Sequence, residues 1–364
     1  MGDTTPDPGL GALPFPPMEA ELVSELPRNN GWQYEPKWDG FRGILERPSE
    51  ADAGDGSVRL WSRNGRPLLR YFPELEVLGS LLPPGSAVDG EIVIARDGRL
   101  DFDAMQARLH PAASRVRRLA EETPAGLVAF DLLLWAGEPV HLRPLEERRA
   151  ALEARLDGAA WPFALSPYTR DADVAEEWLA RVESAGLDGV VAKRLGLPYA
   201  PGERDRVLKV KRRITVDCVV SGVRLKRAAP RTAAVTGLPL QIATLSLGLY
   251  DDLGELRHVG SAAAARGMGV PERIGPLVAG APAMPPPGEG SRWSKGDDLP
   301  WQPIRPELVV EVEVDKLQGE RFRHGARLLR FRPDKDPRQC TLAQVRPARR
   351  PGDVTVESLL SGVR

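Results

Sequence analysis

Residues 35–42 have the sequence Glu35-Pro36-Lys37-Trp38-Asp39-Gly40-Phe41-Arg42, and the interpretation of the chain begins with this lysine. A lysine beside an Asp-Gly turn suits covalent catalysis, because a neutral amine attacks phosphorus once its surroundings lower its pKa. The ordinary lysine pKa is about 10.4, so nearby cations or burial must favour the uncharged form. Alone, Lys-x-Asp-Gly is also the pattern of a lysine on a hairpin turn.

Two later lysines could supply those cations. Lys209 and Lys211 alternate in Val207-Leu208-Lys209-Val210-Lys211, so on a strand both side chains would point to one face. We expect them to neutralise a phosphate and to lower the pKa of Lys37. A basic strand that faces solvent is the alternative.

The motifs between Lys37 and the two-lysine strand identify a family by their order. They are Ser62-Arg63-Asn64-Gly65, Val88-Asp89-Gly90-Glu91-Ile92-Val93, Ala129-Phe130-Asp131-Leu132-Leu133 and Asp188-Gly189-Val190-Val191-Ala192-Lys193. This set resembles the nucleotidyltransferase motifs of ATP-dependent DNA ligases. The resemblance covers roughly residues 15–350. Two further segments are most similar to the minimal C-type bacterial enzymes: Gly31-Trp32-Gln33-Tyr34 and Arg332-Pro333-Asp334-Lys335-Asp336-Pro337.

The resemblance implies an ATP-dependent DNA ligase that acts in DNA repair or recombination. Such an enzyme adenylylates its own lysine, transfers AMP to a 5′-phosphate in nicked duplex DNA, and seals the nick with the 3′-hydroxyl. It uses ATP as the AMP donor and Mg²⁺ or Mn²⁺ as the metal. A separate repair polymerase is an expected partner, and we expect a monomer.

The resemblance also assigns roles to residues of this chain. Lys37 would be the catalytic nucleophile, and Glu91 and Asp188 would bind the metal. The residues expected to bind the nucleotide or its phosphates are Glu35, Arg42, Arg63, Glu91, Phe130, Lys209, Lys211, Arg332 and Lys335. The last two resemble a C-terminal motif that orients pyrophosphate when the C-terminal domain closes about a hinge near residues 211–215. Several have ordinary alternatives, such as a core phenylalanine or a surface arginine.

Two positions depart from the family pattern. Asp188 stands where relatives usually have glutamate, so the carboxylate reaches one methylene less far towards a metal. Val207 stands where many relatives have tryptophan. These departures leave open a DNA-binding module with a decayed transferase domain. An RNA ligase or a GTP-dependent capping enzyme is the other alternative.

The strand and helix patterns predict an α+β fold with antiparallel sheets and flanking helices. We expect a flexible arm over residues 1–16, an adenylation domain over 17–212, and a second domain over 213–364. Short strands joined by turns in the second domain suit a small barrel, and the resemblance implies an OB-fold. Residues 105–122 are expected to form one charged helix.

Composition limits the remaining possibilities. The 364 residues have a net charge of −1, so affinity for nucleic acid must come from local patches such as residues 321–350. Cys218 and Cys340 lack metal-ligand spacing, which argues against the zinc module of NAD-dependent ligases and hence for ATP. The absence of an apolar run long enough for a signal or a span predicts a cytoplasmic protein without a membrane partner, associated with the nucleoid.

Overall fold

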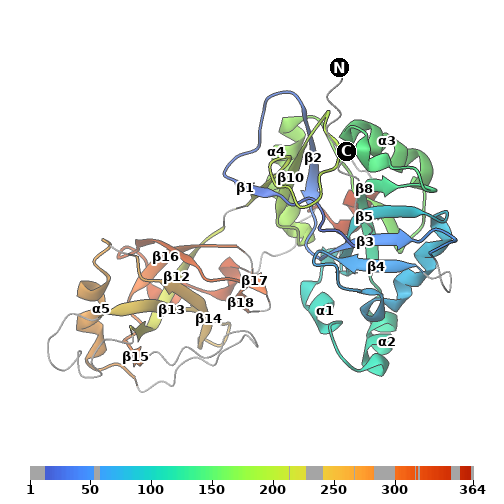
Figure 1. The fold of residues 1–364 in the computed structure, drawn as a ribbon. Coiled ribbons are helices and arrows are strands. Elements are labelled where there is room, and N and C mark those ends of the chain that lie inside the picture. Colours follow the sequence, from blue (N-terminus) through green and yellow to red (C-terminus); the bar gives the residue numbers. More distant parts are fainter. Residues whose placement is uncertain are drawn as a thin grey trace. The chain divides into compact units, whose positions relative to one another are not determined.

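The computed structural model describes residues 13–52, 58–212, 214–226, 241–265, 267–282, 300–315, 317–318, 320–345 and 353–361. The chain divides into two compact units (Figure 1). Unit 1 comprises Met1–Arg212 and Arg349–Arg364, and unit 2 comprises Arg213–Ala348. The second unit is therefore an insertion in the sequence of the first. No helix in the described ranges is both long and apolar enough to cross a membrane.

Unit 1 contains a four-stranded sheet, and Lys37 is the last residue of one of its edge strands. Its order is β1-β11-β10-β2, and only the β1–β11 pair is parallel. The strands are β1 (Glu21–Val23), β2 (Trp32–Lys37), β10 (Gly189–Arg194) and β11 (Val207–Lys211).

A five-stranded sheet completes the framework of unit 1, and its central strands are almost fully buried. The order is β4-β3-β5-β8-β9, antiparallel except for the last pair. The strands are β3 (Phe41–Arg47), β4 (Arg59–Ser62), β5 (Ser86–Val93), β8 (Gly126–Leu134) and β9 (Phe163–Leu165). The two-stranded hairpin β6 (Ala95–Arg96) and β7 (Arg99–Leu100) follows β5.

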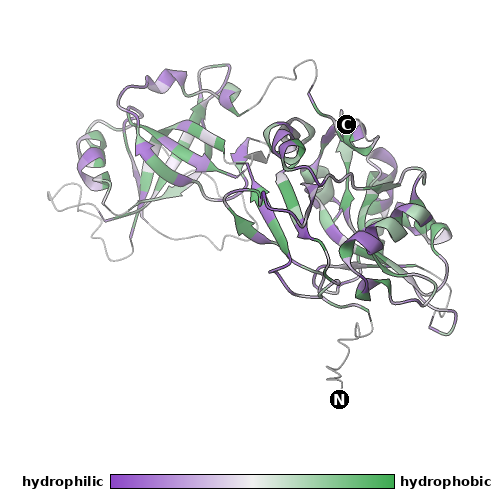
Figure 2. Ribbon diagram, turned by 90° about the horizontal axis from the view of Figure 1, so that it is seen from above, coloured by the Kyte–Doolittle hydropathy of each residue, from purple (hydrophilic) through white to green (hydrophobic). Residues whose placement is uncertain are grey.

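Helices accompany these sheets, and most of them bury apolar side chains, such as Leu75 and Leu78 of η2 and Leu152 of α3 (Figure 2). They are η1 (Leu69–Tyr71), η2 (Pro73–Leu81), α1 (Phe102–Ala107), α2 (Ala113–Glu122), η3 (Val140–Leu142), α3 (Leu145–Leu156), α4 (Ala172–Arg181), η4 (Val182–Ala185) and α6 (Val356–Leu360). The single helix expected over residues 105–122 is wrong, since α1 and α2 are separate. Pro111 lies between them and cannot donate the hydrogen bond that a helix interior requires.

The described residues of unit 2 form a barrel of five successive strands, with a sixth strand paired beside it. Its sheet runs β14-β13-β12-β16-β19, with β15 on the side of β12. A parallel bridge between Ala262 in β14 and Ala326 beside β19 joins the two outer strands. The strands are β12 (Ile214–Leu225), β13 (Ile242–Tyr250), β14 (Leu256–Ala263), β15 (Trp301–Pro303), β16 (Val309–Val314) and β19 (Arg327–Phe331). This closure matches the five-stranded, partly open barrel of an OB-fold.

Short elements surround the barrel. They are α5 (Val270–Val278), β17 (Leu317–Gln318), β18 (Arg321–Phe322), η5 (Pro337–Gln339) and η6 (Leu342–Gln344). The barrel core includes Val220, Leu247 and Val312, which point inwards from three adjacent strands. The antiparallel α+β fold expected from the sequence is thus confirmed.

Both ends of the chain differ from the expected domain boundaries. Residues 1–12 of the expected arm lie outside the described residues, but Phe15 is buried and packs edge-on against Tyr199. At the other end, Val356 and Leu359 of α6 are buried in the core of unit 1. The sequence suggested that these residues belong to the barrel domain. Helix α6 instead belongs to unit 1, because its apolar face packs against residues of that unit.

Candidate active site

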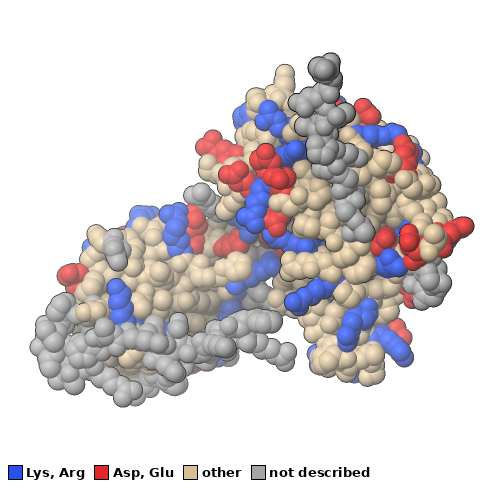
Figure 3. Space-filling model, in the orientation of Figure 1, with Lys and Arg blue, Asp and Glu red and all other residues tan. Residues whose placement is uncertain are grey.

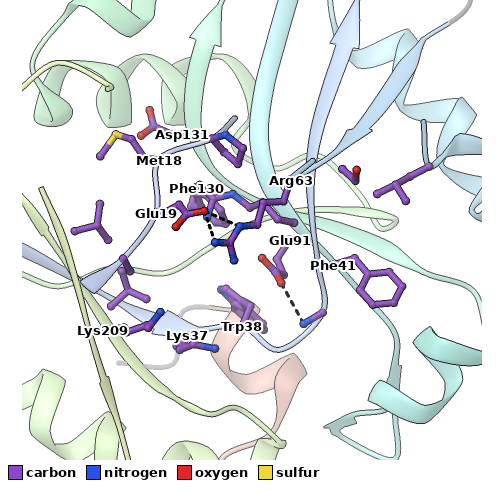
Figure 4. A pocket seen from close by; sticks show the side chains of 18 of the residues that line it. Met18, Glu19, Lys37, Trp38, Phe41, Arg63, Glu91, Phe130, Asp131 and Lys209 are labelled. Carbon is purple, nitrogen blue, oxygen red and sulfur yellow. Dashed lines mark hydrogen bonds and ion pairs between the residues drawn. The ribbon is translucent and has the colours of Figure 1, made fainter. Parts of the chain in front are cut away.

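A cavity of about 850 Å³ in unit 1 gathers most of the residues selected from the sequence (Figure 4). It lies between the two sheets, because side chains of β2, β10 and β11 meet those of β3, β5 and β8 there. The predicted site residues that line it are Glu35, Lys37, Arg42, Arg63, Glu91, Phe130 and Lys209.

Strand register places Lys37 beside Asp188. Gly189 pairs with Lys37 on one side and with Lys211 on the other, so both lysines flank the start of β10. Asp188 directly precedes Gly189, and its Oδ2 lies 2.8 Å from Lys37 Nζ and 3.7 Å from Lys211 Nζ. A Cβ at Gly189 would come within 2.0 Å of the Val210 carbonyl oxygen, so only glycine permits this close strand pairing.

The charge state of Lys37 is the reverse of the sequence-based expectation. Burial alone would lower its pKa, but the Asp188 carboxylate outweighs burial and raises the pKa above the ordinary lysine value. Burial and the charges of Lys37 and Lys211 instead lower the pKa of Lys209. The pKa of Lys37 is therefore raised, opposite to the expectation that Lys209 and Lys211 lower it, because the Asp188 carboxylate lies next to its amine.

Glu91 faces the same cavity from β5. Its Oε1 accepts a hydrogen bond of 3.2 Å from the backbone N–H of Gly40, in the turn that follows Lys37. A Cβ at Gly40 would lie 1.9 Å from the Ile92 carbonyl oxygen, so the turn can approach β5 only with glycine. Burial raises the pKa of Glu91 to about 7, although the charges of Arg42 and Lys37 oppose the shift.

Arg42 is held by two side chains that carry no predicted role. Its guanidinium makes two hydrogen bonds of 2.6 Å to the carboxylate of Asp89, which is fully buried. Tyr199 donates its hydroxyl proton to the same carboxylate at 2.6 Å and accepts a hydrogen bond from the Met18 N–H at 3.0 Å. Burial and Asp89 raise the pKa of the Tyr199 hydroxyl, which therefore keeps the proton it donates.

Phe130 forms an aromatic wall of the cavity, and two cations contact its ring. The Arg42 guanidinium lies 4.5 Å and the Lys193 amine 4.3 Å from the ring centroid. The Lys193 amine also pairs with Glu35 Oε1 at 2.8 Å, and the Gln33 amide donates to the same oxygen at 2.9 Å. These groups give the aromatic end of the cavity a buried polar edge.

Arginines mark the rim of the cavity. Arg63 Nε donates to Glu19 Oε1 at 2.8 Å, and Arg204 pairs with the other oxygen of Glu19 at 2.5 Å. Figure 4 shows the Arg63 guanidinium extending over the cavity towards Glu19. More than half of the Arg63 side chain is exposed, so it remains accessible to an anionic ligand.

The predicted metal ligands fit a metal that arrives with its substrate. Among the described residues, no group of three or more acidic, histidine or cysteine side chains could hold an ion. Mg²⁺ is usually bound by one or two carboxylates together with substrate phosphates and water. Glu91 and Asp188 are two such carboxylates, and both act on the charge of Lys37. Their number and chemistry fit this mode of binding.

Arg332 and Lys335 belong to unit 2, where they share Asp217 of β12. Arg332 Nη1 lies 2.9 Å and Lys335 Nζ 3.5 Å from that carboxylate, and Arg332 also holds Asp334 at 2.9 Å. The hydrogen bond from Arg332 lowers the pKa of Asp334 to about 2. Basic and acidic side chains lie next to one another on both units (Figure 3). In the basic run at residues 321–350, of which 346–350 lie outside the described residues, Arg327 and Arg330 pair with Glu313 and Glu311.

The sequence analysis missed several residues of the site. Lys193, Asp89 and Asp131 stand inside motifs that were recognised, but nothing in the sequence distinguished them from core residues. Asp131 is buried, and its pair with Arg148 at 2.7 Å holds its pKa below the ordinary value. Tyr199 stands in the segment between β10 and β11 and could have been found only from its contacts.

A mixed α+β unit with a lysine-bearing cavity, followed by a five-stranded barrel, defines a protein of the nucleotidyltransferase class. Residues 17–211 match the family model of the ATP-dependent DNA ligase domain, and the chain belongs to this family. The resemblance drawn from the sequence motifs is thereby confirmed.

Two curated relatives agree with this assignment over nearly their whole length. The chain is 46% identical to DNA ligase C2 of Mycolicibacterium smegmatis, over 91% of this chain and 94% of that protein. It is 41% identical to DNA ligase C of Mycobacterium tuberculosis, over 96% and 98% respectively. Among solved structures, one from a structure–function study of Lig E DNA ligases matches with a TM-score of 0.50 and 16% identity, covering 86% of this chain and 99% of that one. This last likeness concerns the fold alone.

Proposed function

We propose that this chain seals nicks between a 5′-phosphate and a 3′-hydroxyl in duplex DNA, through an AMP group carried on Lys37. The observation that carries the proposal is the position of Lys37. This lysine lines a cavity of about 850 Å³ together with Phe130, Lys209 and Glu91, and its amine lies beside the Asp188 carboxylate. That volume is within the usual range for cofactor pockets.

The nucleotide would lie with its base at the aromatic end. A purine ring would meet Phe130 and Val191, which both line the cavity, and its polar edge would face the buried Glu35–Lys193 pair. Arg42, fixed by Asp89, and Glu91 would face the ribose from neighbouring strands, since the two residues are paired in the β3–β5 register. The triphosphate would then extend towards Lys37 and Lys209.

Three chemical steps follow from this arrangement. Lys37 releases a proton and its nitrogen attacks the α-phosphorus of ATP, which forms a P–N bond while the bond to the leaving pyrophosphate breaks. The 5′-phosphate of DNA then attacks the same phosphorus and frees the lysine. The 3′-hydroxyl finally loses its proton and attacks the activated 5′-phosphate, and AMP leaves. Lys209, Lys211 and Arg63 would stabilise the charge that develops on the phosphoryl oxygens.

A divalent cation, Mg²⁺ or Mn²⁺, is part of the proposal. Bound to the phosphates, it would neutralise their charge and polarise the reacting phosphoryl group. Glu91 and Asp188 are the residues that would hold it. Because Asp188 now pairs with Lys37, binding of a cation by this carboxylate would weaken that pair and favour the neutral amine.

Unit 2 would contribute to the first step. Arg332 and Lys335 form a two-cation group held by Asp217, and we assign them to the pyrophosphate that leaves during lysine adenylylation. The adenylation domain would then comprise residues 17–212 together with α6. The OB-fold domain would be the segment between residue 212 and α6. We also propose that the enzyme acts as a monomer in repair beside a separate polymerase, in the cytoplasm near the nucleoid.

Labelled nucleotide tests the proposal directly. The protein is incubated with Mg²⁺ and with ATP or GTP carrying label on the α-phosphate, and the denatured chain is examined for retained label. Label from ATP that is absent in Lys37→Ala supports the proposal. Label from GTP would favour a capping enzyme, and a chain that neither takes label nor already carries AMP by intact mass would contradict it.

A further inference from the structure

The last described residues of the chain return to unit 1. Helix α6 begins at a capping box, in which the Thr355 and Ser358 side chains each accept a hydrogen bond from the backbone N–H of the other residue. Val356 and Leu359 are almost fully buried, and Leu359 is only 5% exposed. A five-residue helix gains little from its own hydrogen bonds, so its position depends on packing.

The surroundings of α6 connect it to the reacting lysine. Val356 and Leu359 share one buried cluster with Trp38 and Leu187. Trp38 directly follows Lys37, and Leu187 directly precedes Asp188. The cluster therefore lies behind both members of the Lys37–Asp188 pair, and Figure 4 shows Trp38 lying against the pale red C-terminal helix.

Hydrogen bonds fix both sides of this contact. The Val356 N–H donates to the Gly98 carbonyl at 2.9 Å, and the Ser184 hydroxyl donates to the Val354 carbonyl at 2.7 Å. On the opposite side, the Trp38 indole N–H donates to the Ser166 hydroxyl at 2.9 Å. Trp38 is thus held by Ser166, which directly follows β9, and by the cluster that contains α6, which leaves the turn after Lys37 little freedom to shift.

We propose that α6 is a positioning element of the active site, and that Val356 and Leu359 set the distance between Lys37 and Asp188 by packing behind Trp38 and Leu187. A nucleophile must approach its target within a narrow range of positions, and a displacement of about 1 Å can cost about 100-fold in rate. The barrel of unit 2 lies between residue 212 and α6 in the sequence. This part of the site is therefore complete only when the residues that follow the barrel have been synthesised.

Leu359→Ala tests the proposal against two matched variants. Leu156→Ala in α3 removes an equally buried leucine, 4% exposed, from a different core cluster of the same unit. Glu357→Ala changes an exposed residue of α6 itself. Leu359→Met, which fills most of the same volume, should restore the wild-type behaviour.

The kinetic measurement distinguishes a positioning role of α6 from a simple loss of folded protein. This measurement rests on the proposed function. Lysine adenylylation and sealing of a pre-adenylylated nick are measured in single turnovers. Leu359→Ala should slow the first about 10-fold or more and the second less than about 3-fold, while both control variants keep the wild-type ratio of the two rates. Equal losses in both steps, or the same ratio change in Leu156→Ala, would overturn the proposal.

A second readout does not depend on the ligase activity. In hydrogen exchange measured by mass spectrometry, Leu359→Ala should lower the protection of peptides that contain Trp38 and Leu187, and Leu156→Ala should not. If wild-type protein forms no AMP adduct, the proposed function fails, and hydrogen exchange still decides the positioning role. Unchanged protection of both peptides in Leu359→Ala would refute that role.

Discussion

Asp188 Oδ2 lies 2.8 Å from Lys37 Nζ, and this ion pair favours the charged form of the lysine. The Asp188 side chain is 5% exposed and that of Lys37 21%, so water screens their attraction only in part. The pair holds Lys37 as an ammonium group, which cannot attack phosphorus. The amine therefore becomes reactive only when a ligand draws the Asp188 carboxylate away or competes for its charge.

Replacing Asp188 should lower the pKa of Lys37. In wild-type protein the Asp188 carboxylate makes the largest contribution that raises this pKa, and Asp188→Asn removes that contribution while burial still lowers the pKa. Titration of Lys37 by amine acetylation and mass spectrometry, without metal or nucleotide, should give a lower midpoint than in wild-type protein. Asp173→Asn, an exposed acid of α4, serves as the control. An unchanged midpoint in Asp188→Asn would show that the pair does not set the charge of Lys37.

Because of Glu91, the stability of the protein should decrease as the pH rises. Its pKa rises from 4.5 to about 7 on folding because of burial, so between these values the folded state binds more protons than the unfolded state. The free energy of unfolding therefore decreases as pH rises from 5 to 7, by about 2 kcal/mol from this group. Urea unfolding of Glu91→Gln should lack that part of the decrease, and parallel curves for the two proteins would disprove the assignment.

Removing the Arg42 side chain should destabilise unit 1. Arg42→Ala would leave Asp89 buried with only the Tyr199 hydroxyl as a donor, and an uncompensated buried charge costs about 3 kcal/mol or more. Arg59→Ala in β4 of the same sheet removes a more exposed arginine, whose contact with Glu46 spans 3.7 Å, and should cost less than about 1 kcal/mol. Similar denaturation midpoints for the two variants would contradict this account of Arg42.

Arg332 should matter for lysine adenylylation and much less for the final sealing step. Arg332→Ala is expected to slow adenylylation about 10-fold or more, since it removes a cation from the proposed pyrophosphate site. Arg327→Ala breaks a more exposed pair with Glu313 on the strand that precedes Arg332, and it should leave both rates within about 2-fold of wild type. Equal loss of both steps in Arg332→Ala would refute the assignment.

The sequence alone identified Lys37, Glu91 and Phe130 because their motifs occur in a fixed order, and the structure brings all three to one cavity. Strand alternation predicted that Lys209 and Lys211 share one face of their strand, and Lys209 lines the cavity. These features are local, and a strand of known direction determines on which face each side chain lies.

Features that depend on contacts between distant segments could not be predicted. The return of α6 to the core of unit 1 depends on two apolar residues, Val356 and Leu359, whose partners lie far away in sequence. The raised pKa of Lys37 depends on a 2.8 Å approach of Asp188, whereas the alternating lysines suggested a lowered one. Charge patterns show which groups are present, but only the fold decides which of them pair.

One measurement tests the central claim most directly. Protein that carries AMP on Lys37 is freed of ATP and mixed with duplex DNA containing a single 5′-phosphate nick and Mg²⁺. We predict that one nick is sealed for each adenylylated chain, that the AMP mass disappears from the peptide containing Lys37, and that Lys37→Arg seals nothing from ATP. An adduct that persists beside unsealed DNA, or sealing by Lys37→Arg with ATP, would contradict the account.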